Sequence, residues 1–191
     1  MSSEKNQSGW QKVAKRIRVP LGFVFAALYL WLARPTWTSI AAGAVIAAVG
    51  VGIRGFASGY VKKNEELTTT GPYAHTRNPL YLGSVVIGIG FAVAALSWWV
   101  VVTIVVLYAA IYVPVIRGEE EFLSAKFPQF AQYAASVPRL LPRVTPAQIG
   151  SAGERGRFSP ELYMKHREYN AIIGAAVVLG ALVAKLMWVS R

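Results

Sequence analysis

Long runs of apolar residues, separated by short polar breaks, dominate the pattern along this chain. A helix that crosses the hydrocarbon core of a bilayer needs about 20 mostly apolar residues, with a range of roughly 17 to 25. Five runs approach or reach this length, and we predict a membrane-spanning helix for each: 19–33, 38–60, 80–96, 98–116 and 169–189. The expected fold is an all-α integral membrane protein with a single membrane domain, residues 1–191.

The breaks between these runs are short enough to predict which spans pair. Residues 34–37, with the sequence Arg-Pro-Thr-Trp, leave room only for a tight turn between the first and second spans. Ser97 alone separates the third span from the fourth. We therefore expect two helical hairpins, followed by a longer polar segment and a fifth span.

Composition and charge support a membrane protein over a soluble one. The chain is 54% hydrophobic and 15% charged, whereas soluble domains carry about 25% charged residues. Its net charge of +11 comes from basic residues that flank the apolar runs, so anionic lipid is the expected partner and nucleic acid is not. Cysteine is absent and there are only two histidines, so we expect no disulfide and no metal site.

The distribution of lysine and arginine predicts the orientation in the membrane. With the N-terminus inside, sixteen of the twenty basic residues lie on the inner side, three lie outside and Arg54 lies within a span. Cytoplasmic loops of membrane proteins are enriched in lysine and arginine. We therefore expect a cytoplasmic N-terminus, an outside C-terminus and a site on the cytoplasmic side.

The segment 71–83, GPYAHTRNPLYLG, is unusually polar for the edge of a membrane helix. Pro79 suits the first turn of the third span, and Asn78 stands where an N-cap residue would. Free backbone N–H groups at a helix N-terminus, with Arg77 beside them, form an anion site. The alternative is an ordinary capped loop with an interfacial arginine.

Arg54 and a pair of glutamates are the other charged residues in unexpected places. An arginine within a span faces the protein interior or a wet cavity, or else extends to lipid phosphate; both alternatives are open for Arg54. Apolar residues recur at helical spacing through 117–142, which predicts an amphipathic helix along the membrane or on the bundle. On that helix Glu119 and Glu120 point toward the apolar face and Glu121 lies further around, so the first two should be paired or bind a ligand.

In this order, the motifs resemble those of the isoprenylcysteine carboxyl methyltransferase and phospholipid methyltransferase superfamily of membrane enzymes. The resemblance covers about residues 54–142. It is carried by these residues: Gly71, Pro72, Tyr73, Arg77, Pro79, Tyr81, Gly83, Glu119, Glu120, Leu123, Phe127, Tyr133 and the segment VPRLLP at 137–142. Asn78 replaces the family's usual histidine, which excludes a titrating imidazole at that position.

The resemblance implies S-adenosylmethionine as the methyl donor. It would be bound by residues of the polar loop and of the glutamate pair: Thr70, Gly71, Tyr73, Arg77, Asn78, Pro79, Tyr81, Gly83, Glu119 and Glu120. Arg77 suits the donor's carboxylate, and the glutamates suit its ammonium or ribose hydroxyls. Thr70, Tyr73 and Tyr81 could enclose the adenine.

The acceptor is expected to be a lipophilic molecule from the bilayer. An amine such as phosphatidylethanolamine is weakly favoured and needs a base, for which Glu120 is the candidate; a prenylcysteine carboxylate would instead need a cation such as Arg54 or Arg139. An NADPH-dependent membrane reductase and a non-catalytic lipid-binding protein are the remaining alternatives.

Overall fold

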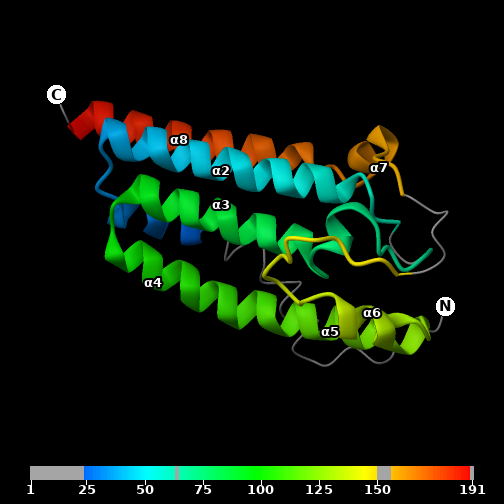
Figure 1. Cartoon of the computed structure of the whole chain (residues 1–191). Helices are drawn as coiled ribbons and strands as arrows, with labels where there is room; N and C mark the ends of the chain where they lie inside the picture. The colour runs from blue at the N-terminus through cyan, green and yellow to red at the C-terminus, as the bar shows by residue number, and fades with distance from the viewer. Residues whose placement is uncertain (1–23, 63–64, 150–155, 190–191) are drawn as a thin grey trace, which may run out of the picture.

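The computed structural model describes residues 24–62, 65–149 and 156–189, and every regular element within these ranges is helical (Figure 1). A helical segment at 24–32 comes first. It is followed by α2 (Trp37–Ser58), the 3₁₀ turn η1 (Gly71–Ala74), α3 (Pro79–Ala95), α4 (Trp98–Leu107), the π-helical turn η2 (Tyr108–Tyr112), α5 (Val113–Lys126), α6 (Phe130–Ser136), α7 (Pro160–Lys165) and α8 (Tyr169–Val189).

Three of the described helices are long and apolar enough to cross a bilayer: Trp37–Ser58, Trp98–Lys126 and Tyr169–Val189. They correspond to the second, fourth and fifth predicted spans. The third predicted span is the apolar helix Pro79–Ala95, which has 17 residues and is shorter. The first predicted span is helical at 24–32, and its earlier part lies outside the described residues.

Local sequence accounts for where the helices begin and end. At the start of α2, Thr36 and Ser39 form a capping box, in which each side chain accepts a hydrogen bond from the other residue's backbone N–H. Pro79 occupies the first turn of α3, where its missing N–H is not needed. The helix ends at Leu96, which has a left-handed backbone with φ of 46°. The tight turn there brings α4 back beside α3.

The pair α2 and α3 packs closely because glycines lie where the two helices cross. A Cβ atom added to Gly50 would lie 2.7 Å from the carbonyl oxygen of Gly83, and one added to Gly83 would lie 2.7 Å from that of Gly50. Small residues allow this approach between membrane helices, where dispersion contacts drive association. Gly83, which was predicted to bind the cofactor, lies in this helix contact, where its missing side chain allows the close approach.

A hydrophobic core at one end of the bundle joins five helical segments. Tyr29, Ile40, Ala94, Val100 and Leu182 are buried together there. The described tryptophans are all exposed at this same end: Trp31, Trp37, Trp98, Trp99 and Trp188. Tryptophan is enriched at membrane–water interfaces, and we call this the tryptophan end. The opposite end, which holds the segment 65–78, α6 and α7, is the loop end (Figure 1).

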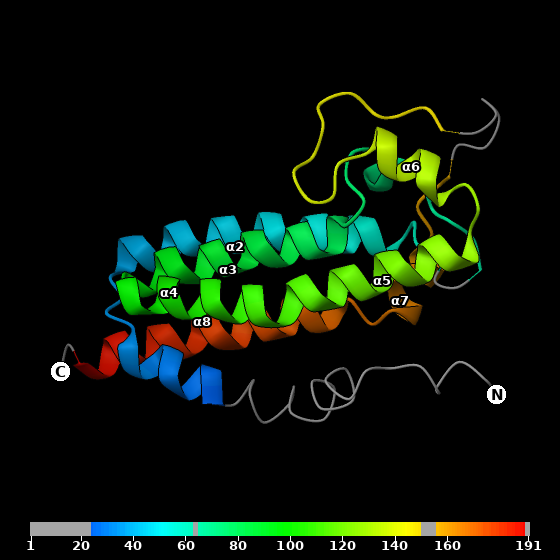
Figure 2. The ribbon, with the colours of Figure 1, turned by 90° about the horizontal axis from the view of Figure 1, so that it is seen from below.

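The fourth span continues without interruption through α4, η2 and α5 as far as Lys126, and Figure 2 shows α5 in line with α4. The prediction of one amphipathic helix over 117–142 is therefore wrong. Pro128 follows a non-helical Phe127, α6 begins at Phe130, and extended chain follows from Val137. The predicted apolar residues do meet, in a cluster around buried Phe130, Tyr133 and Val137 that also includes Leu123, Phe127 and Ala134.

Candidate functional site

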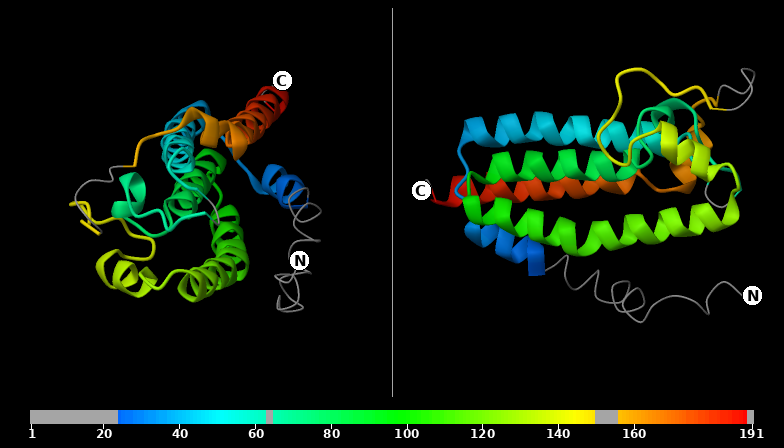
Figure 3. Two further views of the ribbon diagram at one scale, coloured as in Figure 1. Left: turned by 90° about the vertical axis from the view of Figure 1, so that its right-hand side faces the viewer. Right: turned by 60° about the horizontal axis from the view of Figure 1, so that its bottom comes forward.

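The loop 71–78 is held by the non-helical segment 137–149, which we call the strap (Figure 3). Backbone N–H groups of Arg77, Arg143 and Ala147 donate to carbonyl oxygens across the two segments at 2.9–3.0 Å. Nδ1 of His75 lies 2.8 Å from the carbonyl oxygen of Arg143 and therefore donates to it. The start of the loop is set by Gly71, whose φ of 58° favours glycine. The loop is thus fixed by the chain that follows α6.

Asn78 helps to join the loop to the strap and does not act as the predicted N-cap. It precedes Pro79 at the N-cap position, yet its side chain forms no cap. Instead its Nδ2 donates to the carbonyl oxygen of Arg139 at 2.9 Å, and its backbone N–H donates to the hydroxyl of Thr76. The side chain is buried, so it ties the strap to the beginning of α3.

Arg77, Glu120 and Arg139 form a charged cluster between the loop, α5 and the strap. The guanidinium of Arg139 contacts the Glu120 carboxylate at 2.7–3.2 Å. Nη1 of Arg77 lies 3.5 Å from the same carboxylate, and both the Arg77 and Glu120 side chains are largely buried, with exposed fractions of 14% and 12%. Two cations share one anion here, so the cluster carries a net positive charge.

Nε of Arg77 is buried and has no hydrogen-bond partner. Leaving a buried donor unpaired costs about 1–3 kcal/mol, and more for a charged group. An anion beside Arg77 would satisfy this donor and would also balance the excess positive charge. The cluster therefore has the properties of an anion-binding site.

Tyr133, beside Arg77 and Glu120, and Tyr73 are buried next to one another at this cluster. The Tyr133 hydroxyl donates to the backbone carbonyl of Tyr73 at 2.8 Å, and both rings are buried. Burial raises the pKa of Tyr73 well above its usual range, and the nearby Tyr133, Glu119 and Glu168 raise it further. Burial likewise raises the pKa of Tyr133, against the opposing effect of Arg77. Both phenols therefore stay protonated near neutral pH.

The three glutamates of α5 differ in exposure and in their partners, which the sequence pattern did not distinguish. Only Glu120 is held by arginines, whereas Glu119 and Glu121 are both exposed. The prediction that Glu119 points toward the apolar face together with Glu120 is wrong in that respect. Glu119 nevertheless contributes to the raised pKa of Tyr73.

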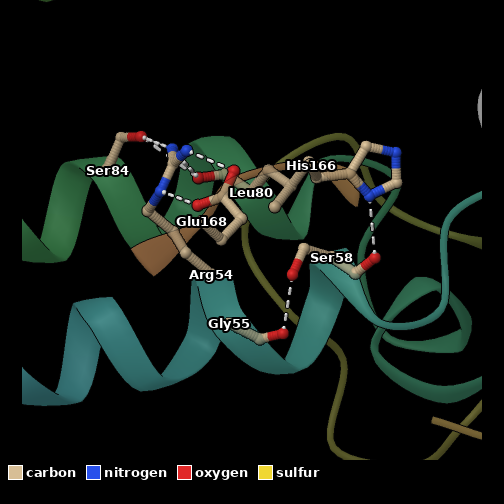
Figure 4. Close-up of polar contacts among 7 residues, drawn as sticks. All are labelled: Arg54, Gly55, Ser58, Leu80, Ser84, His166 and Glu168. Carbon is tan, nitrogen blue, oxygen red and sulfur yellow. Dashed lines mark hydrogen bonds and ion pairs between the residues drawn. The ribbon is translucent and has the colours of Figure 1, made fainter. Parts of the chain in front are cut away.

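A second charged cluster centres on Arg54 of α2 (Figure 4). Its Nε and Nη2 donate to the two carboxylate oxygens of Glu168 at 3.0 and 2.9 Å. Its Nη1 donates to the Ser84 hydroxyl at 2.6 Å and to the carbonyl oxygen of Leu80 at 3.2 Å. Of the two alternatives for Arg54, the structure shows the interior one. Sequence reasoning missed Glu168; the signal was a carboxylate immediately before a membrane-length apolar run.

The remaining predicted donor-binding residues also lie at the loop end. Thr70 precedes η1, and its side chain packs against Gly156. Tyr81 contacts Tyr112 edge to face, with ring centroids 5.5 Å apart. Within the described ranges, no group of three or more His, Cys, Asp or Glu side chains could hold a metal ion.

Comparisons with known proteins identify relatives of this site-bearing region. The sequence profile of the family described as phospholipid methyltransferase matches residues 27–129, a range that contains Arg54, Arg77 and Glu120. The chain is 34% identical over 138 residues to the cobalt-zinc-cadmium resistance protein CzcN of Cupriavidus metallidurans. It is 33% identical over 117 residues to the nickel-cobalt-cadmium resistance protein NccN of Alcaligenes xylosoxydans xylosoxydans.

These alignments are partial. They cover 67% of this chain and 62% of CzcN, and 60% of this chain and 54% of NccN. The chain thus spans less than two thirds of the length of either relative. No solved structure matches it significantly.

Proposed function

The chain belongs to the phospholipid methyltransferase family, and we propose that it is an integral membrane enzyme that transfers a methyl group from S-adenosylmethionine to a lipophilic acceptor in the bilayer. The favoured acceptor is a phospholipid amine of the phosphatidylethanolamine type. The observation that carries the proposal is the Arg77–Glu120–Arg139 cluster with its unpaired, buried Arg77 Nε.

The residues of this cluster fit the charged groups of the donor. The donor's carboxylate would pair with Arg77, because a planar guanidinium binds a carboxylate through charge-assisted hydrogen bonds. Glu120 holds Arg77 and Arg139 in place from the other side. Exposed Glu119, on the same helix, suits the donor's ammonium group. Buried Tyr73 provides an apolar wall beside these charges.

When bound, S-adenosylmethionine supplies a methyl group on a sulfonium, and this chemistry requires no metal ion. The contribution of the chain is to position the acceptor and to exclude water from the loop end. Alignment of two reactants contributes up to about 7–11 kcal/mol in favourable cases. An amine acceptor must also lose a proton. Because two arginines hold Glu120, a water molecule or another carboxylate at the loop end would accept this proton.

The partners of Arg54 and Arg139, the two candidate cations, favour an amine over a carboxylate as the methyl acceptor. Arg54 is bound on both edges, by Glu168 on one side and by Ser84 and Leu80 on the other. Arg139 is bound by Glu120. A prenylcysteine carboxylate would have to displace Glu168 from Arg54 or share the half-exposed Arg139 with Glu120, whereas an amine requires only a base.

The orientation in the membrane is part of the proposal. The described basic residues divide between the two ends, with Arg34 and Lys185 at the tryptophan end and most others at the loop end. By the positive-inside rule the loop end is cytoplasmic and the C-terminal end of α8 is outside. The donor would then enter from the cytoplasm and the acceptor from the bilayer.

The test is donor binding and methylation by purified protein with substitutions at Arg77. We expect calorimetry to show that the wild type binds S-adenosylmethionine and not NADPH. Arg77→Lys keeps the charge but loses the planar fork, so it should weaken donor binding about ten- to a hundredfold. Arg77→Ala should abolish transfer of radiolabelled methyl groups to extracted lipids.

Arg117→Lys is the matched control, because Arg117 is an exposed arginine on α5 close to the cluster in sequence. It should leave donor binding and methylation unchanged. Wild-type donor affinity in Arg77→Ala would show that Arg77 is only an interfacial anchor and that the donor site lies elsewhere. Binding of NADPH with no binding of S-adenosylmethionine would instead indicate the reductase alternative.

A further inference from the structure

Three tyrosines form a continuous aromatic contact between α3 and the π-helical turn η2. The rings of Tyr108 and Tyr112 stack in parallel, with centroids 4.8 Å apart and an interplanar angle of 8°. Tyr112 in turn meets Tyr81 of α3 edge to face. Tyr81 lies in the first turn of α3, at the loop end, so the contact reaches from the loop end into the membrane-spanning part of the bundle.

The hydroxyl of Tyr108 lies at the far end of this contact and has no partner. Its oxygen is buried, and no described group forms a hydrogen bond with it. Tyr29, on the helix at 24–32, shows the usual arrangement, since its hydroxyl donates to the carbonyl oxygen of Phe91 at 2.9 Å. Buried tyrosine hydroxyls normally find such a partner. The unpaired hydroxyl of Tyr108 therefore indicates a ligand that supplies one.

The π-helical turn itself has a local cause that does not explain the hydroxyl. Pro114 follows the turn, and a proline cannot donate the backbone hydrogen bond to the preceding helical turn. A π-helical turn is one way for a helix to absorb this loss, and such turns are frequent at functional sites. The turn contains Tyr108 and Tyr112, whose rings stack. It leaves the Tyr108 hydroxyl unsatisfied.

The depth of Tyr108 indicates which part of an acceptor it meets. Tyr108 is four residues nearer the tryptophan end than Tyr112, which corresponds to about 6 Å along a helix. Tyr112 is level with Tyr81, near the loop-end start of α3. A lipid whose head group reacts at the loop end places its next polar atoms, the ester carbonyls, deeper by a distance of this order. A hydroxyl at this depth suits a carbonyl oxygen.

We propose that Tyr108 is an acceptor-binding residue whose hydroxyl donates to an ester carbonyl oxygen of a diacyl glycerolipid. This rests on the proposed function and narrows its substrate class. A prenyl thioether offers hydrocarbon at the same depth and leaves the hydroxyl unpaired, whereas a diacyl lipid satisfies it. Tyr108 thus selects acceptors by their ester linkage, while the loop-end residues bind the donor.

The test compares diacyl and dialkyl-ether phosphatidylethanolamine as acceptors for wild type and Tyr108→Phe in detergent micelles. The ether lipid has the same head group and chains but no carbonyl oxygen. We expect wild type to prefer the diacyl lipid by about five- to fiftyfold in kcat/KM, as befits one buried hydrogen bond. Tyr108→Phe should lose this preference by becoming slower with the diacyl lipid only. Its donor affinity should not change.

Tyr29→Phe is the matched control, because it removes a buried tyrosine hydroxyl that already has a partner. It should lower the thermal midpoint and leave the ester preference intact, whereas Tyr108→Phe should not lower the midpoint. An ester preference that persists in Tyr108→Phe would overturn the inference while leaving the methyltransferase proposal intact. So would faster methylation of a prenylcysteine than of the diacyl lipid by the wild type. Failure of the wild type to bind the donor or to methylate any acceptor would overturn both.

Discussion

Glu168→Gln should destabilise the protein, because it removes the charged partner of Arg54. The two side chains are only 23% and 11% exposed, and the pair forms two hydrogen bonds of 3.0 and 2.9 Å. Breaking a buried ion pair from one side costs about 3–5 kcal/mol. Arg54 keeps its bonds to Ser84 and Leu80, and glutamine retains one acceptor oxygen, so we expect about 2–4 kcal/mol.

The assay is thermal unfolding in detergent, followed by the fluorescence of the exposed tryptophans. For a chain of this size, 1 kcal/mol corresponds to about 2–4 °C in Tm. Glu168→Gln should therefore lower Tm by about 5–15 °C. The double substitution Arg54→Leu with Glu168→Leu should recover much of the loss, because no unpaired charge remains buried.

Glu65→Gln is the matched control. Glu65 also pairs across the loop end, with Lys165 at 3.4 Å, but these side chains are 62% and 66% exposed. An exposed pair of this kind contributes about 0–1 kcal/mol, so its Tm should hardly change. Equal shifts for Glu168→Gln and Glu65→Gln would refute the reasoning, since burial is what distinguishes the two pairs.

Two further predictions concern packing and pH. Gly50→Ala should destabilise the protein by about 1–3 kcal/mol, because the new Cβ would meet backbone atoms of Gly83 and Ile87 at 2.7 Å. Gly52→Ala should be tolerated, because nothing lies within 4 Å of a Cβ at that position. Similar Tm values for both variants would contradict the close α2–α3 contact. Burial raises the pKa of Tyr73. Above about pH 10 the unfolded chain therefore releases the Tyr73 hydroxyl proton while the folded chain keeps it, and the free energy of unfolding falls by about 1.4 kcal/mol per pH unit. Tyr73→Phe should flatten that fall in Tm between pH 10 and 11, and an unchanged slope would show that Tyr73 titrates normally.

The sequence determined where the helices lie, because the physics involved is local. Apolar runs of membrane length are helical in order to satisfy their own backbone, and the described helices at 37–58, 79–95, 98–126 and 169–189 follow the predicted runs. Pro79 and Asn78 marked the start of α3, and Ser97 marked the turn into α4. The motif order was also sufficient to indicate the methyltransferase family that the profile match then identified.

Local pattern was less reliable where a helix ends in a polar segment. The spacing of Leu123, Phe127 and Phe130 fits one helix, and these residues do share a cluster. They reach it from α5, a non-helical residue and α6. Burial in a common cluster constrains which side chains meet, and several backbone paths can satisfy the same apolar pattern. The break at Pro128 was the residue-level signal for the path that the chain takes.

Only the tertiary structure decided how the charges pair. Arg54 and Glu168 are far apart in the chain and meet because α8 returns beside α2 and α3 (Figure 1). Glu120 rather than Glu119 receives the arginines because the loop 71–78 and the strap bring Arg77 and Arg139 to that side of α5. Desolvation and pairing energies depend on distances across the fold, and residue spacing along a helix does not contain them. For the same reason, the unpaired hydroxyl of Tyr108 could be found only once its surroundings were known.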